Sequence, residues 1–325
     1  MLKKIILVAM FCVSSQISLL SAGLSQNFNA QRAYELSDAA VTGSVYYYFK
    51  DGDTYVFSKR FDNFLLKYDN GKFVRISPVP QDINTFQSVG IPVANDYNLK
   101  EQFQVRDNLY VRFDPYKTEP IEIVDSGKIY TLTDCFYIKD VDGTYGNSNV
   151  YIDYANLKFY FMGEISGETG IAVCDLKTKE AYLILKDNEF GSTTGYSLNY
   201  SPVRIPNTGY LTFYQINSSF LGASPEDYEN TVSNSDFMLM EIPEWKQEMD
   251  LQNKNEQMYP PAARYFIKGP AKVYDSPSGQ SVSVLGDLTK VLALSQKGDW
   301  YEVLYANIRG WMHKDNLSKI TELNK

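Results

Sequence analysis

Histidine is almost missing from this chain, because His313 is the single one among 325 residues. Residues 1–312 therefore cannot hold a Ser-His-Asp triad, a Cys-His pair or a histidine zinc site. A phosphate-binding glycine loop and a nucleotide fingerprint are missing as well. These absences argue against cysteine peptidases, histidine-dependent amidases and zinc endopeptidases, and we expect no metal and no cofactor.

Acids are plentiful, so a carboxylate-dependent glycosidase stays open as an alternative, since it needs only two suitably spaced carboxyl groups. Four acids occur in one region of the chain, namely Asp153, Glu164, Glu168 and Asp175. They lie next to expected hairpin turns, where acidic side chains are usually solvated. No motif supports catalysis there.

Cysteine is scarce, with three in the chain, of which Cys12 lies in the N-terminal segment. Cys135 and Cys174 both occur in strand-like segments. An oxidising compartment would favour a disulfide between them, worth about 3–5 kcal/mol if unstrained. The alternative is two separately buried thiols.

The N-terminus lacks an uninterrupted apolar run of the roughly 20 residues that a membrane span requires. Lys3 and Lys4 precede a shorter apolar stretch, and the small residues of Ser21-Ala22-Gly23 come after it. This pattern predicts a signal peptide over 1–23 and a periplasmic or secreted protein without a membrane span. An uncleaved anchor is the alternative. Because Phe11 stands where a lipid-attachment site needs a small residue before Cys12, we do not expect a lipoprotein.

Positive charge is also in deficit. Without Lys3 and Lys4 the chain has 29 basic and 39 acidic residues, a net charge of −10. Such a charge disfavours nucleic acid or an anionic membrane as the partner. The segment from Arg264 to Lys325 differs, since its nine basic and six acidic residues give +3. That segment could meet an anionic wall polymer.

Aromatic residues are abundant, at 14% of the chain, and alternate with polar ones in short runs. Val45–Phe49 and Thr54–Ser58 flank a turn at Asp51-Gly52, and Asn70-Gly71 separates a second pair of runs. Asn-Gly between alternating runs is a strong hairpin signal. After a helix expected over Ala30–Ala40, the body (24–242) therefore reads as all-β and antiparallel. Its arrangement is either propeller-like or an irregular sandwich.

The segment 243–263 breaks the strand pattern. A short helix could form from Glu244 to Met249, but Asp250–Gln257 is polar. Pro260-Pro261 then stiffens the chain just before residues 264–320, which we call the tail. We interpret this segment as a linker.

The remaining segment carries several motifs in a characteristic order. They are Val273-Tyr274-Asp275-Ser276-Pro277-Ser278, Val282–Leu288, Val291–Leu294, Gly298-Asp299-Trp300 leading into a strand, and Gly310-Trp311-Met312 with a terminal Leu317. Together they resemble the bacterial SH3 family, which implies a small β-barrel over 264–320. Val303, Trp311, Leu285 and Val291 would form its inward apolar set. Many members of the family carry an Arg in the opening strand. This Arg is absent here, so the resemblance does not identify the ligand.

Such domains usually serve as non-catalytic binding modules for wall material. The resemblance therefore predicts ligand-binding residues in the tail, namely Tyr274, Asp275, Asp299, Trp300 and Tyr301. Trp and Tyr suit recognition because each offers a large apolar area with one polar tip. Trp300 could instead pack across the end of the barrel. We expect an exported envelope protein whose partner is peptidoglycan or an envelope protein, unless the tail is purely structural.

Overall fold

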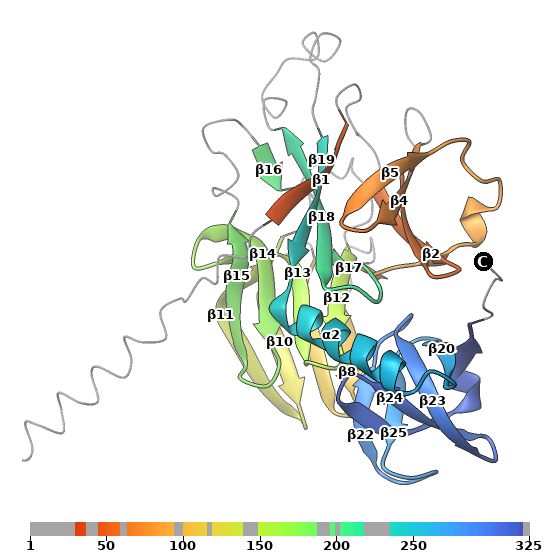
Figure 1. Ribbon diagram of the computed structural model, residues 1–325. Coiled ribbons are helices and arrows are strands. Elements are labelled where there is room, and N and C mark those ends of the chain that lie inside the picture. The colour runs from red at the N-terminus through yellow and green to blue at the C-terminus, as the bar shows by residue number, and fades with distance from the viewer. Residues whose placement is uncertain are drawn as a thin grey trace, which may run out of the picture.

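The computed structural model describes residues 30–36, 45–58, 64–93, 100–115, 119–138, 149–186, 196–198, 202–217 and 235–320. The predicted signal peptide (1–23) lies outside these residues. Within them the protein is all-β, as predicted, and its one α-helix is α2 (Pro243–Met258). Figure 1 shows the strands in four sheets, three in the body and one in the tail.

The first sheet of the body joins the two ends of the body sequence. Its five strands run in the order β1-β19-β18-β16, with β17 also paired to β18. Its strands are β1 (Ala30–Leu36), β16 (Tyr196–Leu198), β17 (Val203–Arg204), β18 (Tyr210–Asn217) and β19 (Ser235–Glu241). The helix expected over Ala30–Ala40 is therefore wrong, because Ala30–Leu36 is a strand antiparallel to β19. Pairing with a partner some 200 residues away overrides the local helix preference.

The second sheet contains both pairs of runs predicted around the turns at Asp51-Gly52 and Asn70-Gly71, joined in chain order as a meander. It has the order β5-β4-β3-β2-β6. Its strands are β2 (Val45–Lys50), β3 (Asp53–Ser58), β4 (Phe64–Asp69), β5 (Lys72–Ile76) and β6 (Gln87–Ser88). Both predicted hairpin turns are confirmed. Asn70 and Gly71 have φ of 46° and 87°, the left-handed values that a tight hairpin turn demands.

The third sheet has nine strands and holds the largest core of the body. Its strands are β7 (Ile91–Pro92), β8 (Glu101–Arg106), β9 (Leu109–Phe113), β10 (Pro120–Asp125), β11 (Lys128–Tyr137), β12 (Asn149–Asp153), β13 (Lys158–Ile165), β14 (Glu168–Asp175) and β15 (Glu180–Lys186). The sheet is wider than the four-stranded blade that a propeller repeats. Of the two arrangements predicted for the body, the irregular one fits this sheet.

The tail forms one seven-stranded sheet, in the order β22-β21-β25-β24-β23-β20-β26. Its strands are β20 (Ala263–Ile267), β21 (Ala271–Tyr274), β22 (Ser281–Leu285), β23 (Lys290–Lys297), β24 (Trp300–Tyr305), β25 (Ile308–His313) and β26 (Leu317–Lys319). All seven strands contribute residues to a single buried cluster, so the sheet curls around its own core.

The inward apolar set of the tail is confirmed in three of its four members. Val303, Leu285 and Val291 are almost fully buried, but Trp311 is only half-buried. In β25 the inward positions are Gly310 and Met312, so strand alternation turns Trp311 to the outer face. A Cβ on Gly310 would lie 2.5 Å from the Tyr274 carbonyl oxygen, which shows how closely β21 crosses β25.

The segment predicted as a linker is mostly helix α2, which lies across the junction of body and tail (Figure 1). Its polar side chains bond to the tail backbone, since Asn255 Nδ2 donates to the Ala306 carbonyl at 2.8 Å and Gln252 Oε1 accepts from the Ala306 N–H at 2.9 Å. The expected short helix from Glu244 to Met249 is thus longer. The polar composition of this segment predicted a flexible linker. The tail residues that its side chains bond to are far away in the sequence, so local reasoning could not reveal them.

Candidate functional site

The outer face of β21, β24 and β25 gathers four half-buried ring side chains, Tyr274, Trp300, Trp311 and His313, which we call the aromatic face. The Trp300 ring lies between two others. Its centroid is 5.4 Å from Tyr274 at 88° and 5.3 Å from His313 at 76°. Trp311 stands opposite Tyr274 in the strand register. The edge-to-face contacts hold Trp300 in place while part of its ring stays exposed.

Two of the ligand-binding residues predicted from the sequence, Tyr274 and Trp300, are thus brought together. Trp311 and His313 were missed, because the family pattern placed Trp311 in the core. Tyr301 lies on the opposite side of β24, where its ring is 5.3 Å from that of Tyr265. Strand alternation therefore separates it from its neighbour Trp300.

The two predicted acids of the tail are exposed at the rim of this region. Asp299 forms an ion pair with Lys314 at 2.8 Å, and the hydrogen bond from this ammonium lowers the pKa of the carboxyl group. Asp275 Oδ1 accepts hydrogen bonds from the Gln280 N–H and the Ser276 hydroxyl, both at 3.0 Å. Asp275 thus organises its local turn, whereas Asp299 links the turn before β24 to Lys314 after β25.

A buried polar network joins body, α2 and tail. Arg204 of β17 forms an ion pair with Glu248 of α2, with Nη1 3.0 Å from Oε2. The Tyr305 hydroxyl of the tail donates to the same carboxylate oxygen at 2.8 Å. Arg204 Nε also donates to the Thr208 carbonyl at 3.1 Å, and the guanidinium lies 4.8 Å from the Trp245 ring centroid. Each nitrogen of the Arg204 guanidinium thus has a partner inside the protein, since Nη2 also donates to the Tyr305 hydroxyl at 3.4 Å.

The same network continues to a second carboxylate. Asp153 Oδ2 accepts a hydrogen bond from Trp245 Nε1 at 2.6 Å, and the Asn156 amide bridges Asp153 and Glu248 at 2.8 and 2.6 Å. Burial raises the pKa of Glu248, while the Arg204 charge opposes that rise. These contacts fix the orientation of α2 on the nine-stranded sheet.

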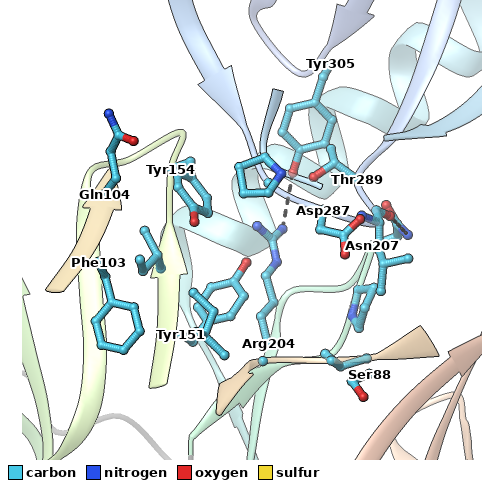
Figure 2. A pocket seen from close by; sticks show the side chains of 18 of the residues that line it. Ser88, Phe103, Gln104, Tyr151, Tyr154, Arg204, Asn207, Asp287, Thr289 and Tyr305 are labelled. Atoms are coloured by element: carbon cyan, nitrogen blue, oxygen red, sulfur yellow. Dashed lines mark hydrogen bonds between the residues drawn. The ribbon is translucent and has the colours of Figure 1, made fainter. Parts of the chain in front are cut away.

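A cavity of about 390 Å³ opens beside this network, between body and tail. Figure 2 shows Arg204 at its centre, with Tyr151, Tyr154 and Tyr305 around it. The wall comes from the β6–β7 connection, β8, β12, β17 and the tail turn 286–289. We call it the junction cavity. Sequence reasoning missed it, because no local pattern signals a space whose wall comes from seven separate segments, Pro270 and Tyr305 of the tail included.

Three of the four acids considered for glycosidase chemistry have other partners. Asp153 belongs to the buried network, Glu168 forms an ion pair with Lys186 at 2.7 Å, and Asp175 Oδ1 accepts from two backbone N–H groups of its turn. Among the described lining residues of the junction cavity, Asp287 is the one carboxylate. A carboxylate-dependent glycosidase would need two.

Cys135 and Cys174 are buried and unbonded in the structure, within one core cluster. Their thiols are in hydrogen-bonding contact, and burial followed by this contact raises the pKa of Cys174. The structure thus brings the predicted pair together across the sheet, while the disulfide itself stays a prediction.

No group of three or more metal-ligating side chains occurs among the residues that the structure describes. The same described residues include no helix of the length and apolarity needed to cross a membrane. A scan of family models finds none that matches the chain, and a search of curated proteins finds no matching relative. The likeness of the tail to the bacterial SH3 family therefore stays a prediction from its motifs.

Proposed function

We propose that this protein is an exported, non-catalytic component of the cell envelope whose SH3-like tail binds wall material through the aromatic face. The observation that carries the proposal is the position of Trp300. Its ring is held by Tyr274 and His313 on the outer surface of the sheet, and part of it remains accessible. Pre-positioned Trp and Tyr rings are the side chains that most often dominate binding energy.

The attachment of the tail supports a role as a rigid platform. Three elements meet at Glu248, which contacts Arg204 of the body and Tyr305 of the tail from within α2. Lys272 of β21 also forms an ion pair with Asp107 of the body at 2.5 Å. The body would thereby hold the aromatic face in one orientation, which reduces the entropy cost of binding.

The test is sedimentation of the purified protein with insoluble peptidoglycan. We expect the protein to co-sediment without releasing soluble sugar. Trp300→Ala and Tyr274→Ala should each weaken binding by about tenfold or more, the loss typical of an interface hot spot. Tyr182→Ala is the matched control, because Tyr182 is a half-buried tyrosine on β15, which Figure 1 shows on the side of the body away from the tail.

Each other outcome identifies a different function. Release of soluble sugar fragments would support the alternative hypothesis, a carboxylate-dependent glycosidase with a targeting tail. Sedimentation that is equally strong in the Trp300→Ala and Tyr274→Ala variants would show that the aromatic face is not the binding surface. If folded protein stays in the supernatant, wall binding is wrong, and capture of an envelope protein or a purely structural tail becomes the better explanation.

A further inference from the structure

The junction cavity is a separate feature from the aromatic face, and none of the four rings of that face lines it. Its volume of about 390 Å³ lies within the range of small-molecule sites, which run from about 300 to 1,000 Å³. Such sites occur preferentially where two structural units meet, and this one lies where body and tail meet. The remaining question is which chemistry the wall accepts.

The one carboxylate among the described lining residues, that of Asp287, already has hydrogen-bonding partners. Asp287 Oδ1 accepts hydrogen bonds from the backbone N–H groups of Gly269 at 2.7 Å and Leu288 at 3.0 Å. Its Oδ2 accepts from Gln87 Nε2 at 2.7 Å. A cationic ligand would have to compete with these three donors, so the cavity offers it little.

The positive charge is satisfied as well. Arg204 is the one cation among the described lining residues, and it is bound to Glu248, Thr208 and Tyr305 in the network described above. An anionic ligand would have to displace Glu248, which would leave a buried carboxylate unpaired. Breaking a buried ion pair in this way carries a large cost. The charge pattern therefore favours a ligand with no net charge.

The rest of the wall is rich in aromatic rings and includes the hydroxyl group of Tyr154. Phe103, Tyr151, Tyr154 and Tyr305 line the space, and Figure 2 shows the hydroxyl groups of Tyr151 and Tyr154 turned toward the region around Arg204. No hydrogen bond of the Tyr154 hydroxyl is found among the described residues. Gly286 leaves room beside Tyr154, since a Cβ there would lie 3.4 Å from the edge of that ring.

We propose that the junction cavity binds an uncharged small molecule that combines a flat apolar ring with at least one hydrogen-bonding group. The ring would pack against Phe103 and the tyrosine rings, and the polar group would meet the Tyr154 hydroxyl. Because both body and tail line the cavity, an occupant would also bridge the two parts.

Two related dyes test the charge requirement on the purified protein. N-phenylnaphthylamine is an uncharged ring compound with one N–H donor, and anilinonaphthalene sulfonate is the same ring system with an added anion. We expect a saturable fluorescence increase with one equivalent of the neutral dye, and about tenfold or more weaker binding of the sulfonate. Equal affinity for the two dyes, or no saturable binding of the neutral one, would overturn the proposal.

Variants locate the site. Gly286→Leu should fill the cavity and abolish neutral-dye binding without backbone strain, because Gly286 is not among the residues with positive φ. Thr289→Leu adds the same side chain at the other end of this tail turn and serves if Gly286→Leu does not fold. Ser281→Leu adds the same side chain at an exposed position of β22 outside the cavity and should leave dye binding unchanged. Unchanged binding in both folded cavity variants would contradict the assignment.

The two proposals can fail independently. Trp300→Ala should leave neutral-dye binding intact, and Gly286→Leu should leave sedimentation with peptidoglycan intact. Loss of both activities in either variant would contradict the assignment of two separate sites.

Discussion

Arg204 and Glu248 form a buried ion pair, with Nη1 3.0 Å from Oε2, that ties β17 of the body to α2. Their side chains are only 8% and 13% exposed, so water could hardly hydrate either charge if its partner were removed. The Tyr305 hydroxyl of the tail binds the same carboxylate oxygen. One ion pair therefore connects three parts of the chain that are distant in sequence.

Removing one member of this pair should be costly. We expect Arg204→Met to lower the free energy of unfolding by about 3–5 kcal/mol, because it leaves the Glu248 carboxylate buried without its cation. Urea titration followed by tryptophan fluorescence would measure it. In the control, Arg309→Met breaks an exposed pair with Glu302 and should cost less than about 1 kcal/mol. If both variants lose the same small amount of unfolding free energy, the Arg204–Glu248 pair is not buried in solution.

Gly310 should not accept a side chain. Because a Cβ there would lie 2.5 Å from the Tyr274 carbonyl oxygen and 2.7 Å from Val273 Cγ1, Gly310→Ala must push β21 away from β25. We expect a loss of about 1–3 kcal/mol of stability, measured by thermal unfolding. Gly286→Ala is the matched control, since its nearest contact would be 3.4 Å. Similar melting temperatures for the two variants would show that β21 and β25 lie further apart than in the structure.

Stability should fall at alkaline pH. Burial, with a further contribution from the charge of Asp287, raises the pKa of Tyr154 to about 12 from its ordinary 10.0. A raised folded-state pKa contributes stability that is complete below pH 10 and is lost as the pH rises toward 12. A shift of this size corresponds to about 2–3 kcal/mol.

Tyrosinate absorbance and circular dichroism, recorded together along the pH titration, would check this. Burial also raises the pKa of Tyr151 and Tyr305, so several tyrosines should ionise only as the fold is lost. Tyr154→Phe should make the alkaline decline shallower. Ionisation of all tyrosines near pH 10 with the fold intact would contradict the burial of these rings.

Cys135 and Cys174 should form a disulfide in an oxidising compartment. Both thiols are buried in one core cluster and interact with each other. Mass spectrometry after thiol alkylation should find neither cysteine modified in protein purified from an oxidising compartment, and both modified after reduction and unfolding. Reduction should cost about 3–5 kcal/mol of stability. Alkylation of both cysteines in denatured but unreduced protein would mean that they remain thiols.

Local patterns in the sequence predicted the elements that depend on contacts between near neighbours in the chain. Alternation over Val45–Phe49 predicted a strand, and Asn70-Gly71 predicted the turn that both positive φ angles require. In the tail, the resemblance to the bacterial SH3 family indicated strands that coincide with β21 to β25. It failed at Trp311, because a motif identifies a residue as important without saying which face of the strand it occupies.

Segments whose conformation depends on distant partners could not be predicted. Ala30–Leu36 is a strand because β19 pairs with it, and the polar residues of α2 are helical because they bond to the tail. Neither partner can be recognised from the neighbouring sequence.

The sequence by itself thus determined the all-β class, the hairpins and the lack of histidine chemistry before His313, since these result from composition and from contacts between near neighbours. Only the tertiary structure decided that Arg204 meets Glu248, that Trp300 lies on an outer face and that a cavity opens between body and tail. Each of these depends on packing between segments that the chain order separates, and packing is a property of the whole fold.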